Sequence, residues 1–597
     1  MPNYINPILL TDSYKLSHIK FTSEGVQTIY SNFTPRFTDY LEAKFKNFDG
    51  GIVWFGIQAA VQKIFVEYWE EGFFKRNKDE VIGEAKTLLS RYIGMEDFKH
   101  FEALHDLGYM PIVIKSLPEG CVVGKGVPCF TITNTHPDYQ WLPNFLESVL
   151  SAEVWKPMTT ATIGRAMKSM VVKAAIKTTG DASGADFQLH DFSFRGQSGI
   201  ESGAASGAGF LLSTMGTDNI PSIAYLQHYY DADIKRDEIA YSVPAGEHSV
   251  TTLGIQIEAK KIIDEAKEQG IYIPDVEDVL EVAERKYVGY VIEKFPEGIV
   301  SYVADSYDYF GFLDKTLPAM KNLIEGRDGK FVVRGDSGDP VEIIAGIKIF
   351  DYSDSPNISV AALDAFSYKF DFESSPLVDG ETFPVIFKFN GAIYKAEYAV
   401  SYDKFGRVFN YEINSLNEYQ LTTQEMGTIS KLFNIFGGHV NSKGYIELNE
   451  KIGMIYGDGI NEERATEIFK RLEDKGFAST NVVFGIGSYT LNMLSRDDLG
   501  TAVKATSATV NGEQVAIYKD PKTDTSKKSA RGLLRVDQRA DGTFELTDNV
   551  SENEELGGLL EVIYEDGKMY NRISYNEVVK TLAEFDNIWV NRMRSSN

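Results

Sequence analysis

The sequence is poor in features that would place it in a specialised class of protein. It has only two cysteines, Cys121 and Cys129, in 597 residues. Neither a disulfide framework nor a zinc site with paired ligands is therefore expected, and a reducing, cytoplasmic compartment fits. No apolar run reaches the roughly 18 residues that cross a membrane. Residues 1–14 lack the basic start and apolar run of a signal peptide.

Positive charge is also scarce. The chain has 60 Lys and Arg against 86 Asp and Glu, which gives a formal net charge of -26. Such a surface repels the phosphate backbone of nucleic acid and the anionic face of a membrane, so neither is expected as a partner. An anionic substrate must then be bound in a local pocket of Arg, Lys and helix N-termini.

Several catalytic motifs are absent. There is no Gly-x-x-x-x-Gly-Lys-Ser/Thr loop, which excludes a P-loop nucleotidase, and no His-Glu-x-x-His pair for a zinc protease. Residues 203–209 are rich in glycine but lack the dinucleotide-binding spacing, so close helix packing is the simpler interpretation.

The chain is too long for one hydrophobic core, and its apolar fraction of 43% can bury several. We therefore predict an α/β protein of more than one domain. The predicted parts are an N-terminal α+β domain (1–150), an α/β-barrel-like catalytic domain (151–349 and 431–500), an inserted antiparallel β module (350–430), and a C-terminal β-rich segment (501–597) that packs with the N-terminal domain.

Short apolar runs that end in polar residues recur through the predicted catalytic domain. Each is too short for a helix and rich in Val, Ile or aromatic residues, which is typical of buried parallel strands in βα units. Polar residues there can be mere solvated turns, but repeated aspartates favour a shared site, because chemistry in such folds gathers at the C-terminal strand ends. The runs are 188–191, 299–305, 331–336, 453–458 and 481–485.

The alternation of strands and helices stops between 350 and 430. Three segments there alternate apolar and polar residues: 383–389, 392–400 and 407–413. Asn390-Gly391 between the first two is a strong signal for a two-residue hairpin. This pattern predicts the inserted antiparallel module.

Three strand-end motifs have the composition of a phosphate and sugar site. Arg334-Gly-Asp336-Ser-Gly-Asp-Pro340 pairs an arginine, which can hold phosphate, with a carboxylate for Mg²⁺ or a ribose hydroxyl. A surface turn with a local ion pair is the alternative. Gly457-Asp458-Gly459 suits close approach of backbone to sugar, and Gly485-Ile-Gly487-Ser488 offers N–H groups to phosphate.

Two further motifs carry a ring and a titratable histidine. Phe192 and Arg195 follow the strand at 188–191, where a flat substrate could stack on the ring; a core phenylalanine is the simpler interpretation. Glu247-His248 lies just before a predicted helix. A lone histidine is usually structural, but at a helix N-terminus beside a glutamate it could transfer a proton or a phosphoryl group.

In this order the motifs resemble the nicotinamide phosphoribosyltransferase family. The likeness runs nearly end to end and is specific as a set. It rests on Leu10 to Lys15, His190 to Gly196, Gly216-Thr217-Asp218, Ser242 to Ser249, Asp305 to Asp308, Arg334 to Pro340, Gly457 to Gly459, Phe484 to Asp497, Tyr518 to Pro521 and Ser526 to Lys528.

The resemblance implies a type II phosphoribosyltransferase: an α/β-barrel-like domain, a smaller mostly β domain, and a homodimer with active sites at the interface. Such an enzyme transfers phosphoribosyl from phosphoribosyl pyrophosphate to nicotinamide. The ring would lie between Phe192 and Tyr14 of the partner subunit, with Asp218 receiving the carboxamide nitrogen.

The same resemblance assigns roles to the other residues. Arg195 and Arg334 would surround the ring and phosphoribosyl group, and Asp305 and Asp336 would lie near Mg²⁺ and ribose. His248, with Glu247 beside it, would be phosphorylated by ATP and so drive synthesis. The residues implied to hold ribose and phosphate are Gly457, Asp458, Gly487, Arg496 and Lys504.

The sequence departs from the family pattern at Ser193, Phe194 and Gly335. The glycine run that binds phosphate also contains fewer glycines, because Ile486 and Ser488 stand in it. Extra length at 255–285 and 350–430 has no assigned role. Two alternatives stay open. Nicotinate phosphoribosyltransferase shares the chemistry, but Asp218 would repel a carboxylate substrate; a non-catalytic nucleotide-binding protein on this scaffold would not need every charged strand-end residue.

Overall fold

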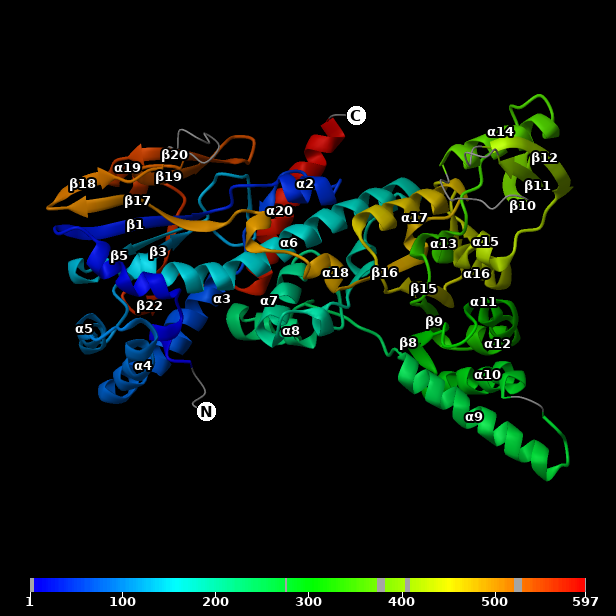
Figure 1. Ribbon diagram of the computed structural model, residues 1–597, viewed down its shortest axis with the longest axis horizontal. Coiled ribbons are helices and arrows are strands. Elements are labelled where there is room, and N and C mark those ends of the chain that lie inside the picture. The colour runs from blue at the N-terminus through cyan, green and yellow to red at the C-terminus, as the bar shows by residue number, and fades with distance from the viewer. Residues whose placement is uncertain (1–4, 274–275, 373–381, 403–407, 520–528, 596–597) are drawn as a thin grey trace.

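The computed structural model describes residues 5–273, 276–372, 382–402, 408–519 and 529–595. Figure 1 shows an elongated molecule with a sheet of N- and C-terminal strands at one end and a second α/β body at the other. The predicted tail motif at 518–528 falls largely on residues 520–528, outside the described ranges. None of the helices within those ranges combines the length and apolar character that a membrane span requires.

The first sheet joins the two ends of the chain. Its seven strands run in the order β18-β17-β1-β5-β3-β21-β22, and every described pairing is antiparallel. Strands from 501–597 thus pair with N-terminal strands on both sides. The bounds are β1 Val26–Thr34, β3 Ile112–Ser116, β5 Phe130–Asn134, β17 Ala502–Val510, β18 Glu513–Ala516, β21 Glu561–Glu565 and β22 Lys568–Met569.

A long helix, α6 (Leu142–Thr179), connects this sheet to the second body. The domain boundary predicted between residues 150 and 151 falls inside it. Pro157 lies inside this helix, where a proline is seldom found, and the local sequence alone predicts a helix only over 159–179. Small residues of α7 (Ile200–Phe210) let it pack closely on α6: a Cβ on Gly209 would lie 2.4 Å from the carbonyl oxygen of Pro157.

The second body is the predicted α/β-barrel-like domain. Six parallel strands run in the order β7-β6-β16-β15-β9-β8. The segment 241–246 joins the two edge strands, because Tyr241 bridges Gly216 of β7 and Ala245 bridges Ser301 of β8. The bounds are β6 Leu189–Asp191, β7 Gly216–Thr217, β8 Glu297–Val303, β9 Asp328–Gly335, β15 Ile452–Tyr456 and β16 Val482–Ile486.

Helices cover the outside of this barrel-like body and also project from it. The hairpin of α9 and α10 extends away from the body (Figure 1) and contains the extra length at 255–285. The main bounds are α8 Ile220–Tyr230, α9 His248–Glu268, α10 Glu277–Lys294, α12 Leu317–Glu325, α13 Pro340–Ala345, α16 Thr428–Phe436, α17 Glu462–Asp474, α18 Ser488–Leu491 and, at the C-terminus, α20 Tyr575–Ser595.

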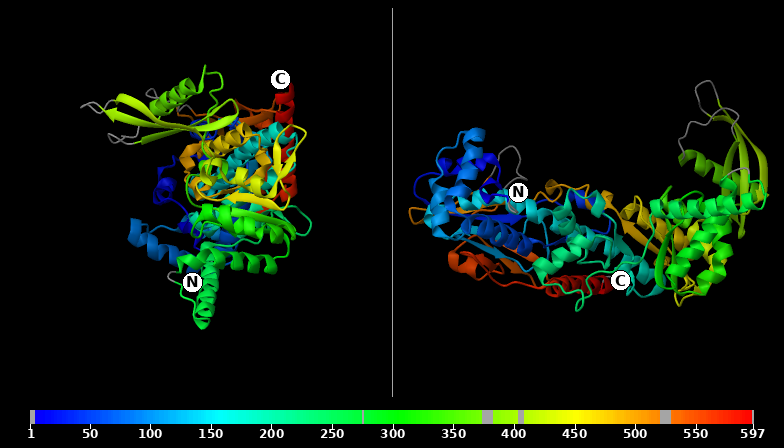
Figure 2. Two further views of the ribbon diagram at one scale, coloured as in Figure 1. Left: turned by 90° about the vertical axis from the view of Figure 1, so that its right-hand side faces the viewer. Right: turned by 90° about the horizontal axis from the view of Figure 1, so that it is seen from below.

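The segment between α13 and α16 folds as its own small unit. Its sheet is antiparallel in the order β10-β11-β12 (Thr382–Phe389, Ala392–Tyr402, Val408–Glu418), and the hairpin turns at Asn390-Gly391 as predicted. A helix that the sequence pattern did not indicate, α14 (Ile358–Phe372), packs on this sheet, with Phe366 stacked 4.2 Å from Tyr398. Figure 2 shows the unit standing out from the body.

This unit leaves and rejoins the body through two touching glycines. Gly346 (φ 74°, ψ -173°) follows α13 and Gly427 (φ 82°, ψ 159°) precedes α16. A Cβ on Gly427 would lie 2.3 Å from the amide nitrogen of Gly346. Both residues occupy a backbone region that is essentially restricted to glycine.

We expect Gly346→Ala to lower the thermal unfolding midpoint, because its Cβ would lie 2.4 Å from the carbonyl oxygen of Glu425 in a glycine-only conformation. The strain alone costs about 1–3 kcal/mol. Gly94→Ala is the matched control, since Gly94 also has positive φ (66°) but open space around its Cβ position. Equal midpoints for the two variants would refute the close contact.

Candidate active site

The C-terminal ends of the barrel strands open into one cleft of about 880 Å³. Nine of the predicted site residues line it, and they follow β6, β9, β15, β16 and the 241–246 segment. The sequence had predicted this gathering at the strand ends. The lining residues are Phe192, Arg195, Glu247, His248, Ser249, Arg334, Asp336, Gly457, Asp458, Gly459, Ile460, Asn461, Arg464, Gly487, Ser488 and Tyr489.

Phe192 is held at this cleft by backbone and by a cation. The guanidinium of Arg334 lies 5.3 Å from its ring centroid. A Cβ on Gly457 would approach the ring to 2.9 Å, and one on Gly485 to 2.3 Å. The two glycines therefore let strands β15 and β16 reach the ring, which is only partly buried. Phe192 thus lines the cleft and is not enclosed in a core; we call its ring the ring platform.

Asp218 lies beside this platform and is joined to it by a histidine. His190 Nε2 and Ser242 Oγ both lie within hydrogen-bond distance of Asp218 Oδ1, at 2.9 and 2.7 Å. The ring of His190 meets that of Phe192 edge to face at 5.1 Å. Within the described residues, Asp218 Oδ2 has no hydrogen-bond partner, so it can accept a further N–H.

The environment of Asp218 favours its charged form. Partial burial opposes ionisation, but hydrogen bonds from His190 and Ser242 and the charge of Arg334 outweigh it and lower the pKa of the carboxyl. Because an ionised carboxylate only accepts hydrogen bonds, His190 donates from Nε2. The site therefore presents a fixed negative charge next to the ring platform.

His248 is the first residue of α9, and its Nε2 lies 3.0 Å from Asp305 Oδ1. The other oxygen of Asp305 accepts from Ser337 Oγ (2.5 Å) and from the backbone N–H of Asp336 (3.0 Å). Burial opposes ionisation of Asp305, but these bonds and His248 outweigh it and lower its pKa. An ionised Asp305 requires the proton of a neutral His248 on Nε2, which leaves a lone pair on Nδ1.

The two carboxylates predicted near Mg²⁺ are connected but already engaged. Asp336 Oδ2 lies 2.6 Å from Arg334 Nη2, while Asp305 receives the three donors above. No cluster of three or more His, Cys, Asp or Glu able to hold a metal occurs among the described residues.

Asp191 and Asn219, which position the site residues, were not among the predicted site residues. Asp191, fully buried at the end of β6, accepts from the backbone N–H of Ser193 (2.7 Å) and from Asn219 Nδ2 (3.2 Å). It thus ties the loop that carries Phe192 to the residue after Asp218. Its position at a strand end was visible in the sequence, but its burial, which raises its pKa, was not.

Three predicted residues lie elsewhere. Tyr14 and Arg496 line a separate cavity of about 510 Å³, and Lys504 Nζ lies 3.9 Å from Glu147, which also lines it. Within one chain, Arg496 and Lys504 thus lie apart from Gly457, and their role in holding phosphate stays a prediction. Lys504 belongs to β17 of the first sheet, and Arg496 follows α18 on the path to it.

The sequence profile described as "Nicotinate phosphoribosyltransferase (NAPRTase) family" matches residues 187–373 and 401–566. The chain belongs to this family. The matched residues include every strand of the barrel-like body. The chain is accordingly a phosphoribosyltransferase, with the type II fold expected from its sequence.

Relatives extend the match over almost the whole chain. A nicotinamide phosphoribosyltransferase of Acinetobacter baylyi is 37% identical over 589 residues, 97% of each protein. One of Xanthomonas campestris pv. campestris is 27% identical over 590 residues, 96% of this chain and 98% of the relative. The crystal structure of human nicotinic acid phosphoribosyltransferase is a distant likeness, with 13% identity and a TM-score of 0.45 over 96% of this chain and 93% of that one.

We expect Gly485→Ala to weaken binding of the ring-bearing substrate roughly five- to tenfold, because the new methyl group displaces Phe192 and an aromatic contact contributes ~1 kcal/mol beyond buried area. The measurement is KM for that substrate in steady-state kinetics. Gly83→Ala, a remote glycine with nothing near its Cβ position, is the control. An unchanged KM for Gly485→Ala would show that the ring position does not matter.

Proposed function

We propose that this enzyme transfers the phosphoribosyl group of phosphoribosyl pyrophosphate to nicotinamide, giving nicotinamide mononucleotide and pyrophosphate for NAD synthesis. The observation that carries the choice of nicotinamide is the ionised Asp218 beside Phe192. Its free oxygen can accept an N–H of the carboxamide, whereas the carboxylate of nicotinate would meet a like charge. The names of the two bacterial relatives support the same choice.

Transfer at C1 of the ribose needs little acid–base chemistry at the nucleophile. As pyrophosphate leaves, the sugar takes on positive charge, which nearby carboxylates such as Asp336 and Asp458 stabilise. Arg334 and Arg195 attract the phosphate groups and Phe192 orients the ring. Magnesium bound on the diphosphate, with Asp305 and Asp336 holding it, would stabilise the leaving group.

We infer that His248 couples the reaction to ATP. Asp305 holds its Nε2, so Nδ1 keeps the lone pair that would attack the γ-phosphorus of ATP and release ADP. Glu247 directly precedes α9, and its carboxylate accepts a hydrogen bond from Ser249 Oγ. A phosphorylated histidine in the cleft would favour binding and turnover of the sugar substrate, and its hydrolysis would make net synthesis favourable.

The separate position of Tyr14, Arg496 and Lys504 supports a homodimer with composite active sites. Tyr14 is 59% exposed, so its ring is accessible to a partner subunit. In the proposed dimer, Tyr14 of the partner subunit would cover the nicotinamide ring opposite Phe192. Arg496 of the partner subunit and Lys504 of the partner subunit would add positive charge for phosphate.

The experiment is an assay of the purified protein with phosphoribosyl pyrophosphate, Mg²⁺ and either nicotinamide or nicotinate, with the mononucleotide read by chromatography. We expect product from nicotinamide. Product from nicotinate alone would keep the reaction but overturn the substrate, and product from neither would favour a binding protein on this scaffold.

Asp218→Asn should lower the ratio of kcat/KM for nicotinamide over nicotinate by about tenfold or more, since facing like charges cost several kcal/mol. The asparagine keeps a carbonyl oxygen for His190 and Ser242, so the loop stays in place. Asp106→Asn, at an exposed ion pair with Lys78, is the control. A ratio that does not change would remove Asp218 from substrate selection.

His248→Ala should abolish the increase in rate that ATP produces, because no other residue in the cleft offers an imidazole. The measurement is the ratio of initial rates with and without ATP. His228→Ala is a matched control, since His228 also pairs with a carboxylate (Glu67, 2.7 Å) but lies outside the cleft. The same ATP response in both variants would rule out a phosphohistidine at 248.

A further inference from the structure

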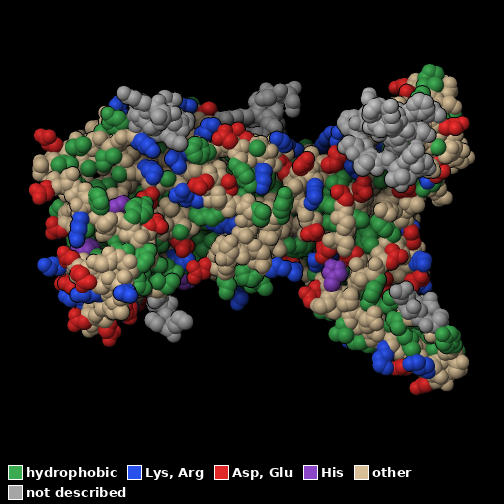
Figure 3. All heavy atoms as spheres, viewed as in Figure 1, with side chains coloured by type: hydrophobic (Ala, Val, Ile, Leu, Met, Phe, Trp, Pro, Cys, Tyr) green, Lys and Arg blue, Asp and Glu red, His purple; other side chains and the backbone are tan. Residues whose placement is uncertain are grey.

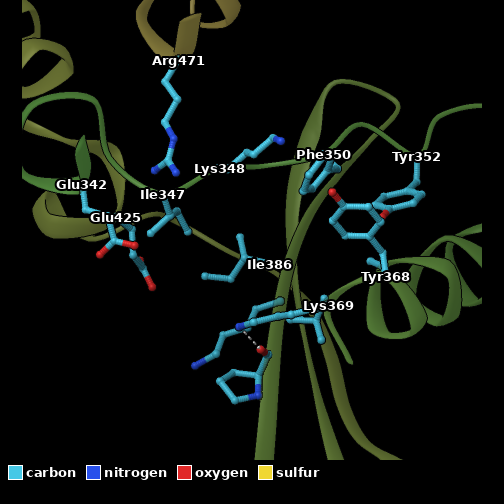
Figure 4. Close-up of a pocket in the computed structure, with 14 residues that line it drawn as sticks. Glu342, Ile347, Lys348, Phe350, Tyr352, Tyr368, Lys369, Ile386, Glu425 and Arg471 are labelled. Atoms are coloured by element: carbon cyan, nitrogen blue, oxygen red, sulfur yellow. Dashed lines mark hydrogen bonds between the residues drawn. The ribbon is translucent and has the colours of Figure 1, made fainter. Parts of the chain in front are cut away.

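A second cavity, of about 470 Å³, lies where the inserted unit meets the barrel-like body, and Figure 4 shows its lining. It shares no residue with the catalytic cleft. Its volume falls in the range of small-molecule sites, about 300–1,000 Å³. The lining residues are Glu342, Ile347, Lys348, Phe350, Tyr352, Ala365, Tyr368, Lys369, Pro384, Val385, Ile386, Lys395, Glu425 and Arg471.

One side of the cavity is aromatic. Figure 4 shows Phe350, Tyr352 and Tyr368 grouped together, with Lys348 beside Phe350 and with Glu342 and Glu425 beyond Ile347. The centroids of Phe350 and Tyr368 are 4.4 Å apart, and Tyr368 is 38% exposed. Phe350 and Tyr352 are only partly buried, so their rings can contact a planar ligand in the cavity.

Two of the cationic side chains in the lining are already paired with carboxylates outside it. Lys395 Nζ lies 3.2 Å from Glu397, and Arg471 Nε lies 2.9 Å from Glu467. Lys348 is therefore the cation on which an anionic group of a ligand would depend.

Lys348 supplies positive charge next to an aromatic ring. Its ammonium lies 4.5 Å from the centroid of Phe350, and no carboxylate of the described residues lies within ion-pair distance of it. Arg471 is fixed instead, since Glu467 and the carbonyl oxygen of Gly346 hold its guanidinium at 2.9 and 2.8 Å. An aromatic face and an uncompensated cation therefore lie side by side.

The carboxylates are suited to hydroxyl groups. Glu425 accepts hydrogen bonds from Tyr419 and Thr422. The side chain of Glu342 has no partner among the described residues and is exposed at the cavity. A ligand with a flat ring, an anionic group and neighbouring hydroxyls would use all three kinds of side chain.

We propose that this cavity binds a nucleoside monophosphate. Its base packs against Phe350 and Tyr352, its phosphate pairs with Lys348, and a ribose hydroxyl donates to Glu342. The inserted unit supplies the rings and the body supplies Glu342 and Arg471, so the ligand binds only where both parts meet. This site is additional to the catalytic cleft and does not depend on which pyridine the enzyme uses.

The test is isothermal titration of the full-length protein with adenosine 5′-monophosphate, and separately with adenosine and with inorganic phosphate. We expect the monophosphate to bind more tightly than either fragment. Lys348→Glu and Phe350→Ala should each weaken binding by tenfold or more, while Lys86→Glu, on the remote helix α4 (Lys78–Ile93), should not. Retained turnover and unfolding midpoint in the variants show that they fold.

Arg334→Ala separates the two sites, because Arg334 lines only the catalytic cleft. Binding that persists in this variant and is lost in Lys348→Glu supports the cavity. Binding that is lost in Arg334→Ala and unchanged in Lys348→Glu assigns the ligand to the cleft and overturns the proposal. The absence of binding of adenosine 5′-monophosphate at millimolar concentration overturns it as well.

Discussion

The closure of the parallel sheet is the constraint on which the site depends. Short backbone hydrogen bonds, Tyr241 N–H to Met215 O (2.7 Å) and Ser301 N–H to Pro244 O (2.9 Å), fasten the 241–246 segment between β7 and β8. Because every strand runs the same way, closure turns all the C-terminal ends toward one cleft. Glu247 and His248 directly follow the closing segment, so the same backbone pairing that completes the barrel also places them opposite Asp305.

Charge at the site is organised by carboxylates that act on neighbours rather than alone. Asp191 fixes the loop of Phe192, Asp305 fixes His248 and the Arg334–Asp336 loop, and Asp218 is fixed by His190. On the outer surface the charges are intermingled: Figure 3 shows Asp and Glu spread over the face in view, with Lys and Arg between them. The acidic composition of the chain thus says little about the cleft, which Arg195, Arg334 and Arg464 line.

Local sequence patterns predicted the strands and the residues that end them, because short buried runs and their terminal aspartates are contiguous in the chain. They predicted the Asn390-Gly391 turn for the same reason. They missed the true start of α6, since Pro157 masks it, and α14, whose role is set by packing on β10–β12. Within one chain, Arg496 and Lys504 lie apart from the cleft residues with which the sequence grouped them. Which body a residue joins depends on strand pairing between residues hundreds of positions apart, as in β1 with β17, and no local pattern contains that information.

The contact between Gly346 and Gly427 bears on how the chain could have acquired its extra unit. A chain that leaves a body and returns within van der Waals contact of its exit point places almost no demand on the length or fold of what lies between. The barrel strands before Gly346 and after Gly427 can keep their pairing whatever segment lies between these two glycines. The position is therefore a natural site for insertion or deletion during evolution, and the module can diverge in sequence while the catalytic body stays under separate selection.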